Sequence, residues 1–236
     1  MQNSPASAAK FDPSRAGEYA EQSRIGLAGY DACHELAACV LASVLGSGST
    51  ARILVAGAGG TASEIVCGAR LEPGWRFLAV DPSEPMLALA RAAVEGAGFS
   101  ERTEFRQAQV GDLSREETFD AATLIGVLHH LPGEEAKRAI LADLSARLKP
   151  GAPLILAGNY RAYAEEPVLL QAWGQRWRQH GADENEVTAK LGKILQGADP
   201  PASEEVVADL LAGAGFEPPL RFFSSLFWGA WVTRKR

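Results

Sequence analysis

The sequence predicts an α/β fold, a doubly wound and mostly parallel sheet of seven strands. From residue 52 to residue 157, short apolar runs alternate with longer segments of helical periodicity. Strands and helices that alternate at this spacing indicate βαβ units, in which helices cover both faces of a parallel sheet. The chain has 236 residues, of which 47% are hydrophobic, so it is long and apolar enough to bury a substantial core.

The central part of the chain supplies the parallel strands and their crossover helices. Strands are expected at 52–56, 76–80, 103–107, 119–125 and 154–157. Helices are expected between them at 61–71, 82–95 and 134–148. The carboxyl ends of these strands then share one edge of the sheet, which is where open α/β sheets bind ligands.

Helical segments are expected before and after this core. Residues 11–47 contain an amphipathic helix at about Asp31 to Leu45, and residues 165–198 contain two helical stretches. Together they predict a lid, formed by an N-terminal helix and a helical insertion after the fifth strand.

The C-terminal segment, 203–236, is expected to begin with a helix that Ser203 caps. Two strands follow at 220–223 and 226–233, so an antiparallel hairpin with its turn at Ser224 and Ser225 is expected at the sheet edge. We therefore predict a single domain, 1–236, around a binding core at 51–157.

Charge and cysteine content exclude several classes of protein. Lys and Arg number 23 against 29 Asp and Glu, a formal net charge of −6, so no overall field attracts nucleic acid or an anionic membrane. The three cysteines are an odd number without Cys-x-x-Cys spacing, which predicts neither a disulfide framework nor a metal site. The first residues lack an apolar signal segment, so a cytoplasmic location is expected.

A glycine-rich turn follows the first expected strand. Gly57, Ala58, Gly59 and Gly60 stand between that strand and the next helix, where glycine lets a ligand approach and free N–H groups can point at it. Asp81 ends the second strand, 22 residues after Gly59, where a carboxylate can accept both hydroxyls of a ribose. This pair predicts a nucleoside-type ligand, either a dinucleotide or S-adenosylmethionine.

Four segments in order resemble the class I S-adenosylmethionine-dependent methyltransferases. They are ILVAGAGGTAS, AVDPSEPMLALARA, FDAATLIGVLHHL and LKPGAPLIL. The N-terminal Gly29-Tyr30 pair and the C-terminal part resemble more closely the small-molecule subgroup that includes carboxy-S-adenosylmethionine synthase. The resemblance implies a methyltransferase with S-adenosylmethionine as cofactor, in which Tyr30 reaches the carboxylate of the cofactor's methionine moiety.

The resemblance also implies the residues of the cofactor site. They are Tyr30, Gly57, Ala58, Gly59, Asp81, Pro82, Met86, Gln109, Val110, Ile125 and His130.

The sequence departs from the family pattern at two positions of the expected cofactor site. Val55 stands where an acidic residue is common, so a charged partner for the methionine ammonium is missing. Gln109 stands where an Asp commonly accepts from the adenine amine, and Asp112 takes that place in a shifted alignment. A protein that keeps the fold and has lost its cofactor is therefore one alternative.

A further departure concerns the reaction. Leu191 stands where the carboxy-cofactor synthases hold a carboxylate with Arg, and an apolar side chain cannot make that contact. We therefore expect methyl transfer to a small-molecule nucleophile by in-line displacement at the sulfonium methyl, which needs positioning more than a strong base. The methyl acceptor, and whether oxygen, nitrogen or carbon is methylated, does not follow from the sequence.

Catalytic candidates are few. His129 and His130 follow the fourth strand and can act as a base or line the cofactor pocket, and Tyr160 follows the fifth. Trp173 and Trp177 share a helix face and either line an apolar substrate pocket or pack the lid on the core.

Two other functions are compatible with the sequence. The string GAGGTA also satisfies the dinucleotide pattern, so an NAD(P)-dependent oxidoreductase is possible, although no Tyr-x-x-x-Lys pair accompanies it. The second of these functions is that of a non-catalytic binding protein with the same fold. A small-molecule substrate is the expected partner in the enzyme readings, and a homodimer is compatible with the apolar lid and tail.

Overall fold

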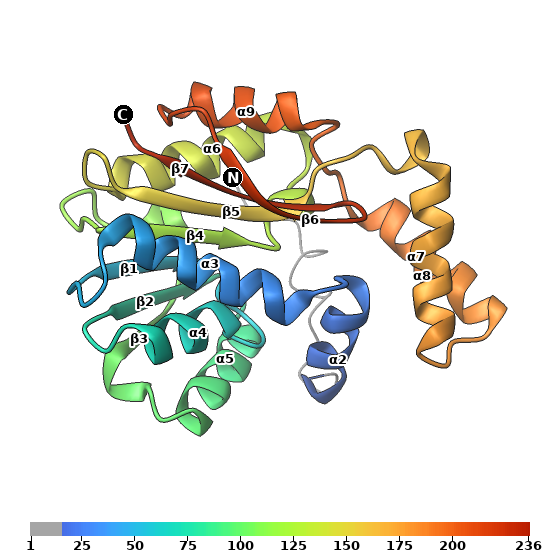
Figure 1. Cartoon of the computed structure of the whole chain (residues 1–236), viewed down its shortest axis with the longest axis horizontal. Coiled ribbons are helices and arrows are strands. Elements are labelled where there is room, and N and C mark those ends of the chain that lie inside the picture. Colours follow the sequence, from blue (N-terminus) through green and yellow to red (C-terminus); the bar gives the residue numbers. More distant parts are fainter. Residues whose placement is uncertain (1–15) are drawn as a thin grey trace.

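The computed structural model describes the backbone of residues 16–236 and the side chains of residues 19–236. Its centre is a seven-stranded sheet with the order β3-β2-β1-β4-β5-β7-β6, and helices cover both faces (Figure 1). The strands are β1 (Arg52–Ala56), β2 (Arg76–Asp81), β3 (Thr103–Gln107), β4 (Ala121–Ile125), β5 (Pro153–Asn159), β6 (Leu220–Ser225) and β7 (Trp228–Arg234). The predicted fold class is confirmed.

The helices lie close to the predicted ranges. They are α2 (Ala16–Gly26), α3 (Tyr30–Leu45), α4 (Ser63–Leu71), α5 (Glu84–Gly96), α6 (Gly133–Arg147), α7 (Pro167–Gln179), α8 (Glu184–Gly197) and α9 (Glu204–Gly213). Short 3-10 turns are η2 (Ser100–Arg102), η3 (Val110–Asp112), η4 (Leu128–His130) and η5 (Tyr163–Glu165). The predicted cap of α9 is present, because the Ser203 side chain accepts from the Val206 N–H.

The strand directions follow from the connections. β1 to β5 are parallel, whereas β7 runs antiparallel to β5 and to β6. The helices α4, α5 and α6 make three of the parallel connections, and the connection from β3 to β4 contains only the turn η3. The hairpin turn lies later than predicted, because Ser224 and Ser225 still pair with Gly229 and Trp228. The chain turns at Leu226, whose φ is 49°, and this places Phe227 in the protein interior.

Two apolar layers hold the helices on the sheet. One contains residues of α3, α4 and α5, including Cys33, Ile65 and Ala90, and the other contains residues of α6 and α9, including Leu141 and Leu210. The side chains of successive strand residues alternate between these layers, which is the period-two pattern of a strand buried on both faces.

The N-terminal part contains one more helix than expected. The predicted helix from Asp31 is α3, and α2 precedes it in the segment 11–47, of which residues 11–15 lie outside the described part of the chain. Within the described residues no single helix is long and apolar enough to span a membrane. The pair α2 and α3 passes that test only together and is bent by 83°.

After β5 the chain forms α7 and α8, here named the arm. Figure 1 shows the arm at one end of the molecule, on the side where α2 also lies. The arm occupies the position of the predicted helical insertion.

Candidate functional site

The glycine loop, residues 57–62, folds back onto the end of β2. Gly57 and Ala58 donate their N–H groups to the Val80 carbonyl at 2.8 and 3.1 Å, and Gly60 donates to the Met86 carbonyl at 3.0 Å. The expectation that these groups are free to point at a ligand is therefore wrong for this structure. The loop contributes to a ligand site chiefly because its glycines carry no side chains that would block the approach of a ligand.

Close packing explains the glycines. Gly57 has a φ of 68°, and a Cβ there would lie 2.2 Å from Cγ2 of Val127. A Cβ on Gly59 would lie 2.4 Å from Cβ of Met86 and 2.8 Å from Oδ2 of Asp81. Both distances are too short for a side chain, so only glycine fits at these two positions.

Asp81 holds its carboxylate against the glycine loop. Its Oδ2 accepts from the Gly59 N–H at 3.1 Å and its Oδ1 accepts from the Ser83 N–H at 2.8 Å. Burial raises the pKa of Asp81, and these two hydrogen bonds oppose the rise. An ionised carboxylate offers about four acceptor positions, so Asp81 retains capacity for a ligand's hydroxyls. These acceptor positions fit the hydroxyl groups of a ribose.

The two residues proposed for the adenine lie in one turn. The Gln109 N–H donates to Oδ2 of Asp112 at 3.0 Å, and the Gln109 side chain accepts from the Asp112 N–H in return. The direct alignment, which gives Gln109, and the shifted alignment, which gives Asp112, therefore place the adenine contact at the same turn, η3. Arg147, a buried residue of α6, fixes this turn by donating to the carbonyls of Gly111 and Leu113 at 2.7 and 2.5 Å.

Tyr30 lies beside the glycine loop. Its hydroxyl is 2.5 Å from Oγ1 of Thr61, and its ring packs on His34 with a centroid distance of 4.3 Å. The structure thus joins the start of α3 to the loop.

Tyr19 of α2 is a site residue that the sequence did not reveal. A Cβ on Gly60 would lie 2.4 Å from Cε1 of Tyr19, so the Tyr19 ring packs directly on the glycine loop. Burial raises the pKa of the Tyr19 hydroxyl, and the nearby carboxyls of Glu64 and Asp81 add to this effect. Asp81 therefore lies near this side chain. Nothing in the composition of residues 16–26 marks this tyrosine, because its contact with the loop is 41 positions distant in the sequence.

Glu64 is a second acid beside the loop that the sequence analysis missed. Val55, at the place where the family carries an acid, is buried in the apolar layer under α3 and α4. Glu64 stands in the first turn of α4, with its Oε2 3.8 Å from Nε2 of His34. Burial raises the pKa of Glu64, while the neighbouring His34 opposes the rise.

His129 lies in η4, after β4, and is buried. Its Nδ1 accepts the Asn159 N–H at 3.3 Å, so the proton of the neutral ring is on Nε2. Burial, and then His130 and Lys137, lower the pKa of His129 well below its ordinary value. A ring in this state is a poor base, which favours a role in shaping the pocket. The His130 ring packs on it at 4.2 Å between centroids.

Tyr160 points to the opposite layer from the glycine loop and Tyr30. It is buried with Trp231, and its hydroxyl accepts from Arg161 and Arg221 at 3.0 and 3.2 Å. These contacts give Tyr160 a structural role and do not support the catalytic role considered from the sequence.

The carboxyl end of β5 carries a second group of polar and aromatic residues. Asn159 is buried and donates from Nδ2 to the Tyr163 hydroxyl at 2.7 Å, while its Oδ1 has no partner among the described residues. Tyr163, Trp173 and Phe227 form a buried aromatic cluster next to it. Trp173 therefore packs the arm on the core.

The predicted cofactor residues are gathered at one edge of the sheet. Ile125 ends β4 beside β1, and Pro82 follows Asp81 and accepts from the Gln107 side chain at 3.2 Å. The order β3-β2-β1-β4 places η3, Asp81, the glycine loop and η4 in sequence along this edge.

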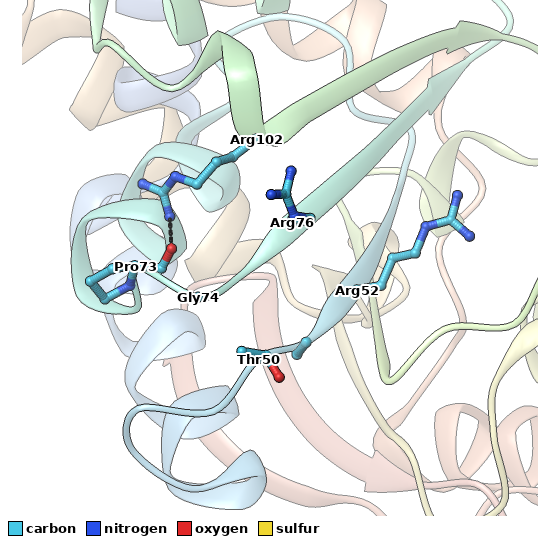
Figure 2. Close-up of a pocket in the computed structure, with 7 residues that line it drawn as sticks. Thr50, Arg52, Pro73, Gly74, Arg76 and Arg102 are labelled. Atoms are coloured by element: carbon cyan, nitrogen blue, oxygen red, sulfur yellow. Dashed lines mark hydrogen bonds between the residues drawn. The ribbon is translucent and has the colours of Figure 1, made fainter.

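A separate hollow lies at the amino ends of β1 and β2 (Figure 2). Arg102 donates there to backbone carbonyls, including Pro73 at 3.0 Å, and Arg52 pairs with Glu117. Of the three arginines that line the hollow, Arg52, Arg76 and Arg102, these contacts give Arg52 and Arg102 a structural role. None of the predicted site residues lines this hollow.

A comparison with known protein families matches the part of the chain that forms the sheet edge with Asp81. Residues 54–154 match the family model described as a methyltransferase domain. The matched segment is 101 of the 236 residues of the chain. S-adenosylmethionine is the expected cofactor of such a domain, and the match spans the glycine loop, Asp81, η3 and η4.

Relatives extend the comparison beyond this domain. A protein of a Synechococcus strain, syc1184_c, is 36% identical over 102 residues, which cover 42% of this chain and 23% of that protein. The structure is similar to a Burkholderia thailandensis 1,6-didemethyltoxoflavin-N1-methyltransferase that binds 1,6-didemethyltoxoflavin and S-adenosylhomocysteine. That similarity has a TM-score of 0.63 at 23% identity and covers 100% of this chain and 92% of the other.

A Nostoc punctiforme protein described as a putative O-methyltransferase is similar with a TM-score of 0.63 at 13% identity. The aligned part covers 86% of this chain and 55% of that protein. The chain thus spans about half the length of this relative and matches under a quarter of the Synechococcus protein. Both structural similarities establish a shared fold.

Proposed function

We propose that this protein transfers a methyl group from S-adenosylmethionine to a small-molecule nucleophile. The observation that carries the proposal is the half-buried Asp81 carboxylate, held by two backbone N–H groups against a glycine loop with no space for side chains. Bound at this edge, S-adenosylmethionine supplies an electrophilic methyl group on a sulfonium. Asp81 would hold the ribose, and η3 would hold the adenine.

The arm supports a small-molecule acceptor. It stands after β5, and its Trp173 packs with Tyr163 and Phe227 beside Asn159. Asn159 offers a buried polar atom at the same edge of the sheet as Asp81, where an acceptor could be oriented. His129, with a lowered pKa, would contribute shape rather than proton transfer. The arm would exclude water and position the acceptor.

Within the subgroup that the sequence resembles, we propose methyl transfer rather than carboxy-cofactor synthesis. Leu191 packs against Gly174 of α7, since a Cβ on Gly174 would lie 3.3 Å from Cδ1 of Leu191. The neighbouring Lys190 bonds the Gln22 side chain and lies over the Trp177 ring. Neither side chain is arranged to bind a carboxylate of the cofactor.

Calorimetric titration tests the proposal. The purified protein is titrated with S-adenosylmethionine, S-adenosylhomocysteine and NAD, and the first two are expected to bind in the micromolar range. The Asp81→Ala variant removes hydrogen bonds to a charged group, each of which is worth about 1.5–3 kcal/mol, so its affinity is expected to fall at least tenfold.

Asp120→Ala is the matched control. Asp120 also accepts a backbone N–H, from Arg52, but at the amino end of β1, far along the strand from the glycine loop. It should keep the affinity of the wild type. Binding of NAD alone would instead identify an oxidoreductase, and binding of none of the three by folded protein would identify a fold without its cofactor. After cofactor binding, 1,6-didemethyltoxoflavin is a first acceptor to assay.

A further inference from the structure

The last turn of α2 is held by the arm through its backbone. Trp173 donates its indole N–H to the Gly26 carbonyl at 2.7 Å. Arg176 donates from Nε to the Ile25 carbonyl at 2.7 Å and from Nη2 to the Arg24 carbonyl at 2.8 Å. The last carbonyls of a helix have no partner within the helix, so these bonds satisfy groups that would otherwise need water.

Charge favours the same contact. The carboxyl end of a helix carries a partial negative charge, and the Arg176 guanidinium is placed directly on it. Lys190 of α8 adds a bond to Gln22 of α2 at 2.9 Å. Both helices of the arm therefore bind α2.

The other end of α2 reaches the glycine loop. Tyr19 packs on Gly60, one residue beyond Gly59, which bonds Asp81. A single helix of three turns thus connects the arm to the edge where the ribose is expected.

We infer that Arg176 and Trp173 are positioning residues for the cofactor site, which act through α2 by holding Tyr19 on the glycine loop. The inference rests on the proposed function and deepens it. If the inference holds, the arm and the cofactor site are coupled, and cofactor binding stabilises the docking of the arm on α2. By linkage, the docked arm strengthens cofactor binding by the same factor.

Hydrogen exchange and calorimetry with S-adenosylhomocysteine test this coupling without any acceptor. In the wild type, S-adenosylhomocysteine is expected to slow the exchange of amides in α7, residues 167–179, although these residues lie outside the cofactor edge. In Arg176→Ala this protection is expected to be lost, and the affinity for S-adenosylhomocysteine is expected to fall about fivefold or more, the lower end of typical coupling. Arg176→Lys keeps the charge and loses the fork of donors, so it should recover part of the affinity.

Arg178→Ala is the matched control on the same helix. Arg178 is exposed and bonds only the Gln175 side chain in the described structure, so this variant removes the same charge without touching α2. It should keep both the affinity and the protection. Trp173→Phe keeps an aromatic ring and removes one bond to α2, and serves if Arg176→Ala fails to fold.

Each other outcome overturns the inference. Wild-type protein that binds S-adenosylhomocysteine without protecting α7 has no coupling, although the proposed function stands. Equal affinity and protection in Arg176→Ala, Trp173→Phe and the wild type show that these side chains do not position the site. If folded wild type does not bind S-adenosylhomocysteine, the proposed function fails, and the positioning role fails with it.

Discussion

The cofactor edge and the arm are held by contacts of different range. At the cofactor edge, segments 22 or 23 residues apart bond each other, since the Gly57 N–H donates to the Val80 carbonyl and the Gly59 N–H donates to the Asp81 carboxylate. The arm is held by side chains that reach backbone carbonyls across the chain, with Trp173 bonding a residue 147 positions earlier. The glycines and the acid of the cofactor edge leave a recognisable sequence pattern, whereas a side-chain contact across 147 positions does not.

The largest effect is expected from a methyl group placed inside the glycine loop. In Gly57→Ala the new Cβ meets Val127, and a left-handed alanine costs about 1–2 kcal/mol in addition. Overpacking adds about 1–3 kcal/mol. We expect a clear loss of unfolding free energy in urea and loss of S-adenosylhomocysteine binding.

Gly98→Ala separates the two causes. Gly98 also has a left-handed φ, of 81°, but nothing lies within 4 Å of a Cβ there. In this variant the free energy of unfolding should fall only by the cost of a left-handed alanine, and the protein should bind S-adenosylhomocysteine with the affinity of the wild type. Equal losses in both variants would show that the loop is not closely packed in solution.

An intermediate effect is expected at the base of the arm. Tyr163→Phe removes the partner of the Asn159 amide, and an unpaired buried polar group costs about 1–3 kcal/mol. Burial raises the pKa of Tyr163 to about 12, so the hydroxyl is protonated at neutral pH and no charge is lost. We expect lower stability in urea with unchanged affinity for S-adenosylhomocysteine, because the ring that packs on Trp173 remains. A loss of affinity would show that the two regions are coupled at this point as well.

The smallest effect is expected from Glu64→Gln. A carboxyl whose pKa is higher in the folded than in the unfolded state binds its proton more tightly when folded, so stability falls as pH rises between the two values. The variant cannot ionise, and its Tm should exceed that of the wild type by a few degrees at most at neutral pH. The difference should vanish at acid pH, where Glu64 is protonated in both states.

Glu95→Gln, at an exposed position of α5, is the control and should leave the pH dependence unchanged. A variant at Glu64 that is less stable than the wild type at neutral pH would mean that the ionised Glu64 carboxylate stabilises the fold.

The range of the contacts also explains what the sequence could predict. The glycine loop and Asp81 follow from spacing alone, since strand ends and turns are local features. The use of the loop N–H groups by Val80 and Met86 could not be foreseen, because it depends on how the loop folds over β2. Tyr19 was missed for the same reason, since its contact with Gly60 requires the path of α2.

Burial decided the remaining differences. The turn of the C-terminal hairpin lies beyond the two serines because Phe227 is buried when the chain turns at Leu226. Tyr160 follows β5 as expected, but the alternation of side chains along the strand sends it to the layer of Trp231. Residue type suggested a polar role for Tyr160, and its position in the strand determined which face it occupies.

The arm leaves and rejoins the core at almost the same point. The Ala162 N–H donates to the Ala202 carbonyl at 3.3 Å, and the Asp199 N–H donates to the His129 carbonyl at 2.7 Å. The segment between Ala162 and Asp199 therefore begins and ends at neighbouring points of the core, and its length and shape can vary without a change in the sheet. Relatives with one inherited core can therefore acquire different acceptors by replacing this segment, as long as the new segment still binds the last turn of α2.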